Sequence, residues 1–226
     1  EMPALTRTVR WLDADPKATA AMKNAFLHRG KGLHYAALKA TYEAKLGAAS
    51  EAATDAKKFL LFTNEKKHAQ WIQQELEKNG TPCFLLTGDV NAKKRNALIA
   101  LAAEVGAGIV ATIDTLKEGV DGLQHVASTC IFHSLDFVPL KLLQAEKRLD
   151  RLGQREPVSV LYLCLRESMD AWLSETVIDK LQQWEGLVGG TEEGLKTAVQ
   201  GRGKGQSEEE LEQEVLKSIY LKAGAK

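Results

Sequence analysis

The feature that most constrains the fold is an alternation, from Lys58 onward, of short apolar runs with amphipathic segments of helical length. Continuously apolar runs of this length are typical of strands buried on both faces of a parallel sheet. The helical segments between them supply the crossovers that parallel strands require. The predicted strands are Phe59–Thr63, Cys83–Leu86, Gly108–Ile113, Thr129–Ser134 and Val158–Leu165. We therefore predict an α/β fold with helices on both faces of the sheet and ligand-facing loops at the carboxyl ends of the strands.

The segment before this alternation is alanine-rich and predicted to be helical. Asp15 followed by Pro16 is a typical helix start, and a second helix is expected from about Leu33 to Leu46. We interpret Ala48–Ala56 as a connector, and Thr8–Leu12 as a short strand that precedes the helices.

The segment after the alternation begins with a helix expected through Met169 and Trp184. Glycines follow Val188, and Ser207 with Glu210 forms a capping box that predicts a last helix, which we expect to dock on the domain rather than serve a dedicated partner. The predicted division is an N-terminal helical segment and connector over 1–56, a main domain over 57–188, and a Gly-rich linker with a C-terminal helix over 189–226.

The overall charge excludes a protein that binds nucleic acid through one broad positive field. The sequence has 30 basic and 30 acidic residues, so any nucleic-acid contact must be local. Cys83, Cys130 and Cys164 each lie in an apolar run, which favours buried thiols over a zinc site or disulfides. No signal peptide is recognisable, and no apolar run reaches the roughly 20 residues of a membrane span. We expect a reducing, cytoplasmic setting.

The strongest chemical signal is the string QAEKRLDRLGQ at 144–154, within a helix predicted to open at Pro139 and end at Gly153. Helical spacing places Gln144, Arg148 and Arg151 on one face, so that two guanidinium groups converge. Such planar, permanently charged groups stabilise the charge that spreads over a transferring phosphoryl group. The structural alternative is that basic residues in a last turn complement the helix dipole.

A second group of candidate residues follows the predicted strand that ends near Ile113. This loop carries the hydroxyl of Thr115, Lys117, Gly119 and the carboxylate of Asp121. A glycine-bearing loop at the carboxyl end of a strand can offer N–H and O–H groups to a phosphate and a carboxylate to a ribose. The alternative is an ordinary turn in which Asp121 caps a helix.

The string at 144–154 resembles motif VI of SWI/SNF-type ATPases, whose usual form is QAxDRxHRxGQ. Lys147 stands in place of the usual Asp and Asp150 in place of the usual His. The stretch at 111–123 resembles motif V of superfamily 2 helicases, with an EGVD core nearer to their RGxD than to the GGxGxN of SWI/SNF proteins. Phe59–Asn64 resembles motif IV. Thr87-Gly88 followed by Arg95 resembles the stretch that reads GxxxxxxR in the family. Val138, before Pro139, occupies a position where relatives have Asn.

The resemblance covers about 58–188 and implies the second RecA-like lobe of a superfamily 2, SWI/SNF-type helicase or translocase. It implies that Arg148 and Arg151 act as arginine fingers and that Gln144, Gly119 and Asp121 contact ATP. Thr87, Arg95, Thr115 and Lys117 are the implied contacts to the backbone of DNA, more plausibly duplex. Arg95 as a solvated helix residue is an equal alternative for that position.

The sequence contains neither a GxxxxGK[ST] phosphate loop nor an Asp-Glu pair for magnesium, and no metal site is expected in it. We therefore expect ATP and Mg²⁺ to be held mainly by an N-terminal RecA-like lobe of the same parent protein, and this chain alone to be inactive. The rival hypothesis is a non-catalytic RecA-like module that binds protein or nucleic acid. A flavodoxin-like enzyme is disfavoured because no Gly-rich fingerprint follows the first strand.

Overall fold

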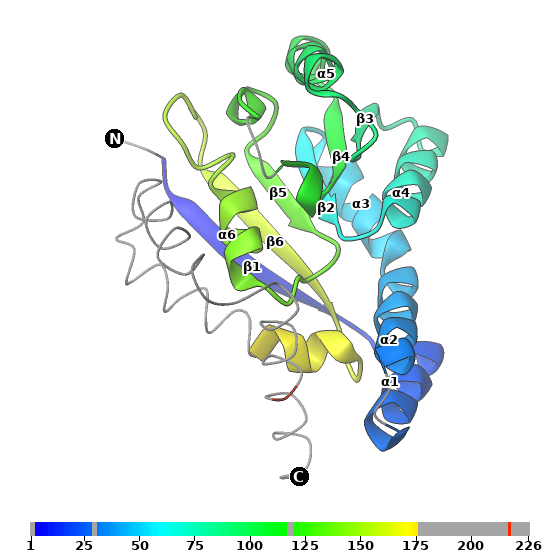
Figure 1. Ribbon diagram of the computed structural model, residues 1–226. Coiled ribbons are helices and arrows are strands. Elements are labelled where there is room, and N and C mark those ends of the chain that lie inside the picture. Colours follow the sequence, from blue (N-terminus) through cyan, green and yellow to red (C-terminus); the bar gives the residue numbers. More distant parts are fainter. Residues whose placement is uncertain (1–2, 29–30, 117–119, 176–216, 218–226) are drawn as a thin grey trace, which may run out of the picture.

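The computed structural model describes residues 3–28, 31–116, 120–175 and 217. Its centre is a sheet of six strands, all parallel, in the order β1-β6-β5-β2-β4-β3 (Figure 1). The strands are β1 (Leu5–Leu12), β2 (Phe59–Thr63), β3 (Cys83–Leu86), β4 (Gly108–Thr112), β5 (Thr129–Phe132) and β6 (Val158–Leu165). The predicted parallel α/β sheet is confirmed, and the first strand begins at Leu5 rather than Thr8.

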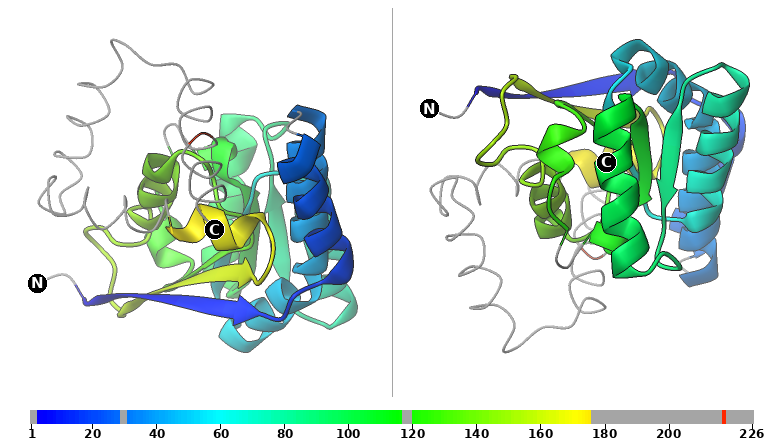
Figure 2. Two further views of the ribbon diagram at one scale, coloured as in Figure 1. Left: turned by 90° about the horizontal axis from the view of Figure 1, so that it is seen from below. Right: turned by 90° about the horizontal axis from the view of Figure 1, so that it is seen from above.

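In the described residues, seven α-helical segments surround the sheet. They are α1 (Pro16–His28), α2 (Lys31–Ala44), α3 (Leu46–Ala56), α4 (Lys66–Lys78), α5 (Ala92–Val105), α6 (Pro139–Glu146) and the helical residues 169–175. Two short 3₁₀ turns, η1 (Ile113–Leu116) and η2 (Leu123–His125), follow β4. Both views of Figure 2 show α1 and α2 side by side at one edge of the molecule.

Helices cover both faces of the sheet, as expected from strands that are apolar throughout. Leu60 and Phe62 of β2 pack in a core with residues of α5, α6 and the helical residues 169–175. The alternate residues Phe59 and Leu61 pack in a second core with α3 and α4. All five residues of β2 are buried, because successive side chains enter opposite cores.

Local signals place the helices between the strands. The Asn91 Oδ1 accepts a hydrogen bond from Lys94 N at 2.9 Å and caps α5, which ends at Gly106 in the left-handed conformation (φ +71°). At the start of β4, a Cβ on Gly108 would lie 2.3 Å from the Phe59 ring. Only glycine therefore allows β4 to enter the sheet over that ring.

The interpretation of Ala48–Ala56 as a connector was wrong, because this stretch is most of α3. Alanine is the strongest helix former, and the glycine at 47 falls in the first turn, where its cost is small. Ala49 and Ala53 are fully buried in the core that contains α4. Close packing against β2 and α4 thus uses the small side chains that suggested a linker.

The N-terminal segment is attached to the sheet along its whole first strand. β1 pairs with β6 from Leu5 opposite Val158 to Leu12 opposite Leu165. The predicted helix start is confirmed, since Asp15 Oδ1 accepts a hydrogen bond from Ala18 N at 2.9 Å. α1 and α2 then return the chain to α3 and β2.

The three cysteines are free thiols, with Cys130 and Cys164 buried and Cys83 half-buried. Burial raises the pKa of Cys83 and of Cys164 to about 12 and that of Cys130 well above its ordinary value. These shifts favour the thiol over the thiolate, which is the nucleophilic form. Across the described residues, no helix is long and apolar enough to cross a membrane.

Several predicted features fall outside the described residues. They are Lys117 and Gly119, the part of the last long helix beyond 175, the Gly-rich stretch after Val188, and the helix expected from Ser207, apart from Lys217.

Candidate functional site

Three of the predicted nucleic-acid contacts lie together beyond the carboxyl ends of β3 and β4. Arg95, in the first turn of α5, donates through Nη1 to the carbonyl oxygen of Thr115 at 2.8 Å and through Nη2 to that of Val90 at 3.4 Å. Val90 N in turn donates to the carbonyl oxygen of Thr87 at 2.9 Å. The arginine thus joins the loop after β3 to the turn after β4.

Arg95 is half-buried, so it is not the solvated helix residue that the sequence left open. Thr87 and Thr115 are both buried, and the Thr115 hydroxyl is hydrogen-bonded to that of Thr112. Arg95 holds the two loops together, because two of its guanidinium nitrogens donate to backbone carbonyl oxygens, one in each loop.

The helix that carries the motif-like string is shorter than predicted. α6 ends at Glu146, and 147–152 form turns instead of continuing the helix to Gly153. Arg148 N donates to Ala145 O and Leu149 N to Glu146 O, which are the tighter bonds of a 3₁₀ turn. Glu146 and Leu149 are both fully buried. Anchoring both in the core draws the chain inward and overrides the helical periodicity.

The two arginines nevertheless reach neighbouring residues of one loop. Arg148 Nη1 donates to the Val120 carbonyl oxygen at 3.3 Å, and Arg151 Nη1 lies 3.2 Å from Asp121 Oδ1. A hydrogen bond from Gly122 N and the charge of Arg151 lower the pKa of Asp121. Both arginines therefore approach one loop, but they do so from successive turns, and the prediction of a single helical face was wrong.

Gln144 is half-buried on α6. Asp121 accepts its hydrogen bond from the adjacent Gly122 N at 2.9 Å and does not cap the helical turn η2, whose first residue follows Gly122. Lys141 of α6 lies 3.5 Å from Asp114 and 3.4 Å from Asp136, so α6 also reaches the turn after β4. One helix and its following turns therefore contact the loop at both of its described ends.

The sequence of the chain matches a known family. The sequence profile of the family described as "Helicase conserved C-terminal domain" matches residues 38–153, which include the two arginines and the whole of the loop they contact. The chain belongs to this family.

Curated relatives agree with the family match. The SWI/SNF-related matrix-associated actin-dependent regulator of chromatin subfamily A-like protein 1 of Xenopus tropicalis is 26% identical over 147 residues, which are 63% of this chain and 16% of that protein. The chromodomain-helicase-DNA-binding protein 1-like of Danio rerio is 31% identical over 123 residues, 54% of this chain and 12% of that protein. The chain therefore spans only a small part of these relatives.

The fold also has a counterpart among solved structures. The crystal structure of the C-terminal part of the Fun30 ATPase domain aligns with a TM-score of 0.67 and 12% identity, over 78% of this chain and 89% of that chain. At this identity the likeness establishes the fold alone, which is RecA-like. Together the matches confirm the resemblance to the C-terminal lobe of SWI/SNF-type superfamily 2 helicases.

The two positions where this helicase C-terminal domain departs from the motif VI string form an ion pair with each other. Lys147 Nζ lies 2.6 Å from Asp150 Oδ2, and both side chains are largely buried, with exposed fractions of 11% and 8%. The family usually has Asp at position 147 and His, which can carry a positive charge, at position 150, so the acidic and the basic residue stand in the opposite order. The two departures are thus mutually compensating in charge.

A buried network that the motifs did not predict holds α6 to the sheet. Glu146, fully buried, accepts from Arg7 Nε and Nη2 at 3.0 and 2.6 Å through Oε2 and also accepts from the Tyr162 hydroxyl. Burial, with the Glu146 charge beside it, raises the pKa of Tyr162 well above its ordinary value. Glu146 occupies a variable position of the string. The only available signal was its helical spacing between the apolar residues Leu142 and Leu149.

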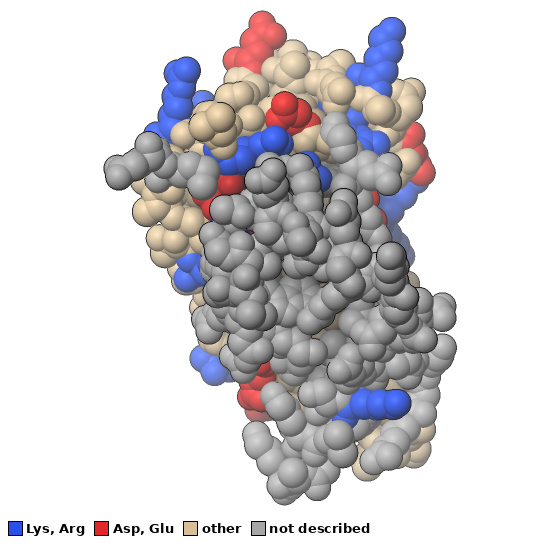
Figure 3. Space-filling view, turned by 60° about the vertical axis from the view of Figure 1, so that its left-hand side comes forward, with Lys and Arg blue, Asp and Glu red and all other residues tan. Residues whose placement is uncertain are grey.

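In the view of Figure 3, both basic and acidic side chains appear among the described residues that are not covered. In the part of the chain that the structure describes, no group of three or more His, Cys, Asp or Glu side chains could hold a metal ion.

Proposed function

We propose that this chain is the second motor lobe of an ATP-dependent DNA helicase or translocase, in which Arg148 and Arg151 are arginine fingers. The observation that carries the proposal is that both guanidinium groups contact consecutive residues, Val120 and Asp121, of the motif V loop. The residues assigned to nucleotide and the loop that leads to the nucleic-acid contacts thereby form one connected unit. Belonging to the helicase C-terminal family supports the same conclusion.

The residues present fit the phosphates of ATP, because planar guanidinium groups match phosphate oxygens in shape and charge. ATP, when bound with Mg²⁺, supplies the phosphoanhydride bond whose hydrolysis powers such motors. Arg148 and Arg151 would neutralise charge on the transferring group, with Gln144, Gly119 and Asp121 as the further contacts of the nucleotide site. Asp121 would also hold Arg151 in position, through the contact at 3.2 Å.

The partner that completes the nucleotide site is an N-terminal RecA-like lobe of the same parent protein. This sequence has no phosphate loop to cradle ATP and Mg²⁺, so the isolated chain should show no appreciable ATPase activity. Robust DNA-stimulated turnover by the rigorously purified chain would contradict the half-site hypothesis.

We place the DNA backbone along the loops that Arg95 joins, with Thr87, Thr115 and Lys117 as its further contacts. The sequence has 30 basic and 30 acidic residues, which favours few phosphate contacts. Binding should therefore be weak, independent of sequence and lost as salt rises. Tight binding that persists at high salt, or a strong base preference, would instead favour a dedicated binding module.

The deciding experiment measures steady-state ATPase activity of the full-length parent. Arg148→Ala or Arg151→Ala should lower turnover by about 10³-fold, the scale of an arginine finger. Arg148→Lys should not restore activity, because an ammonium cannot reproduce the planar fork. Arg166→Ala is the matched control, since Arg166 is exposed over the Trp11 ring and remote from the motif V loop.

Thermal melts of the same variants separate catalysis from folding. If the arginines only complement the end of α6, each substitution should cost no more than about 1 kcal/mol of stability and leave turnover near that of the parent. Near-normal turnover in the double variant would remove the finger assignment and favour the non-catalytic binding module.

The domain division and the cytoplasmic setting are also proposals. The division assigns 1–56 to an N-terminal segment, 57–188 to the motor lobe and 189–226 to a linker and helix. β1 belongs to the first of these by sequence and to the sheet by hydrogen bonding. The three free thiols support a reducing compartment.

A further inference from the structure

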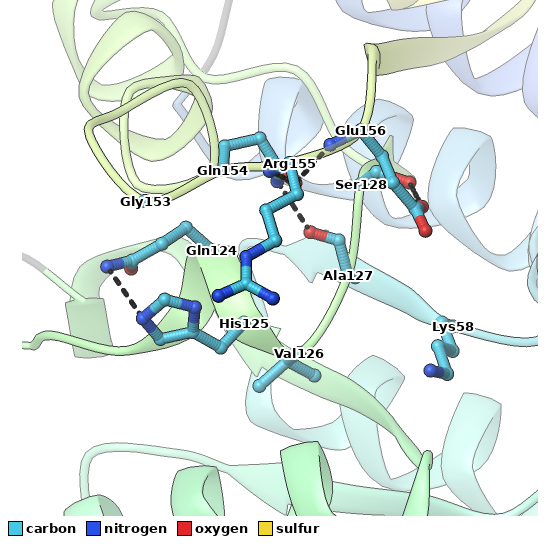
Figure 4. Close-up of a pocket in the computed structure, with 10 residues that line it drawn as sticks. All are labelled: Lys58, Gln124, His125, Val126, Ala127, Ser128, Gly153, Gln154, Arg155 and Glu156. Atoms are coloured by element: carbon cyan, nitrogen blue, oxygen red, sulfur yellow. Dashed lines mark hydrogen bonds between the residues drawn. The ribbon is translucent and has the colours of Figure 1, made fainter. Parts of the chain in front are cut away.

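A polar pocket of about 340 Å³ lies at the amino ends of the strands, beyond the turns that carry the two arginines (Figure 4). Lys58 immediately precedes β2, Ser128 precedes β5, and Arg155 with Glu156 precedes β6. The pocket is therefore at the opposite end of the sheet from Thr87 and Thr115. Gly153 and Gln154 end the motif VI string, but no residue assigned to ATP or DNA lines this pocket.

The side chain of Gln154 builds one wall of the pocket. Its Nε2 donates to the Ala127 carbonyl oxygen at 3.1 Å, and its Oε1 accepts from Arg155 N at 2.9 Å and from Glu156 N at 3.1 Å. These bonds fix the backbone from which Arg155 extends. Gly153 adopts a φ of +98°, and a Cβ there would approach the His125 ring to 3.2 Å, so the turn packs closely on η2. The wall is thus formed before any ligand arrives.

Two of the residues that line the pocket, Lys58 and Arg155, carry a positive charge. Lys58, His125 and Arg155 line it from three separate segments, and Figure 4 shows the Arg155 guanidinium between the His125 ring and Val126. Glu156 is its only acid, and the Glu156 carboxylate accepts from Ser128 Oγ at 2.9 Å. Within the described part of the chain, neither Lys58 nor Arg155 forms an ion pair. Lys58 and Arg155 thus offer two exposed cations to an anion that enters the pocket.

We propose that this pocket binds a phosphate group. A guanidinium supplies the planar donor pair and an ammonium the point charge that phosphate oxygens accept, and the histidine ring adds a third donor. The volume accommodates a phosphate with its remaining hydration or the phosphates of a nucleotide. A free nucleotide and the backbone of a nucleic acid offer the same group, and both are tested below.

The first experiment titrates the 226-residue chain with inorganic phosphate and follows the His125 Cε1–H signal by NMR, at constant ionic strength in chloride. Phosphate should shift this signal saturably, while the other histidines serve as internal references. Arg155→Ala and Lys58→Ala should each weaken phosphate binding about fivefold, the effect of one charge at contact distance in water. Lys93→Ala, at an exposed lysine of α5 that lines no part of the pocket, should leave it unchanged.

A charge change of opposite sign makes the test two-sided. Glu156→Gln removes the only acid but keeps an acceptor for Ser128, so it should tighten phosphate binding about threefold. No saturable shift of His125, or a shift that the Arg155→Ala/Lys58→Ala double variant retains in full, would overturn the proposal.

The source of the phosphate is decided by repeating the titration with ADP and, by fluorescence anisotropy, with a labelled DNA duplex. If Arg155→Ala weakens the binding of ADP but not of the duplex, the ligand is a nucleotide. If Arg155→Ala weakens binding of the duplex, and inorganic phosphate competes with the duplex, the ligand is the nucleic-acid backbone. These measurements need neither a first lobe nor ATP hydrolysis. Failure of the arginine-finger proposal would therefore leave them unaffected, and the reverse also holds.

Discussion

The ion pair between Lys45 and Asp170 should be a large determinant of stability. Both side chains have an exposed fraction of 0%, and Lys45 Nζ lies 2.6 Å from Asp170 Oδ2. The same Nζ donates to the Leu163 carbonyl oxygen at 2.9 Å, and Asp170 Oδ2 accepts from Leu165 N at 3.0 Å. Lys45 stands between α2 and α3, so this one side chain joins the N-terminal helices, β6 and the helical residues 169–175.

We expect Lys45→Met to lower the free energy of unfolding by about 3–5 kcal/mol, because it leaves the Asp170 carboxylate buried with no counter-ion. With a urea m-value of about 2 kcal/mol/M, the unfolding midpoint should fall by about 2 M. Urea titrations followed by circular dichroism measure this directly. Lys17→Met is the matched control, since Lys17 pairs with Glu43 on the surface of the same segment, and its midpoint should barely move.

The double variant Lys45→Met/Asp170→Leu tests the physical reason. Replacing both charges with apolar side chains removes the uncompensated carboxylate, so most of the lost stability should return. A single variant that loses less than about 1 kcal/mol, or a double variant no more stable than Lys45→Met, would refute the reasoning, because desolvation of an unpaired charge predicts neither.

Three further outcomes follow from individual contacts. Burial lowers the pKa of His133 well below 6.5, so below about pH 6.5 the folded chain binds fewer protons than the unfolded chain. The free energy of unfolding should therefore fall by up to about 1.4 kcal/mol for each pH unit below that value. Urea titrations across pH 5–7.5 should show that His133→Gln removes this pH dependence. Lys147→Asp should cost about 2–4 kcal/mol in thermal melts by placing a second carboxylate beside Asp150, and adding Asp150→His should recover most of it. Because the Asp121 carboxylate is exposed, Asp121→Asn should change stability by less than about 1 kcal/mol. The same substitution should lower ATP turnover of the parent about 10-fold, because Arg151 loses the partner that positions it. Unchanged turnover would show that the ion pair has no role in function.

The sheet could be predicted because its physical cause is local. A strand that is buried on both faces is apolar along its length, so a run such as Phe59–Thr63 can be recognised as a strand from the sequence alone. The capping Asn91 and the left-handed Gly106 likewise fix the ends of α5 through bonds to their own neighbours. These features depend on residues close in sequence.

The errors arose where distant residues decide the local structure. Ala49 and Ala53 are helical because they fit against β2 and α4, and nothing within 48–56 distinguishes such a helix from a small-residue linker. α6 ends early because Glu146 is bound to Arg7, a residue 139 positions away in sequence. The periodicity of the motif string predicts a continuous helix only while that contact is unknown.

The candidate site shows the same division between local and distant causes. The motif string predicts that Arg148 and Arg151 converge from one helical face, whereas they contact Val120 and Asp121 from successive turns. Their role as arginine fingers stays a prediction. Compared with the motif alone, Lys147 and Asp150 are two separate departures. The 2.6 Å contact between Lys147 Nζ and Asp150 Oδ2 shows that they form one pair, in which the acidic and the basic residue occupy each other's usual positions. A departure from a motif is therefore informative only together with the residue it contacts. Here that contact joins the two substituted positions within the turns that carry both arginines, and the finger assignment stays a proposal.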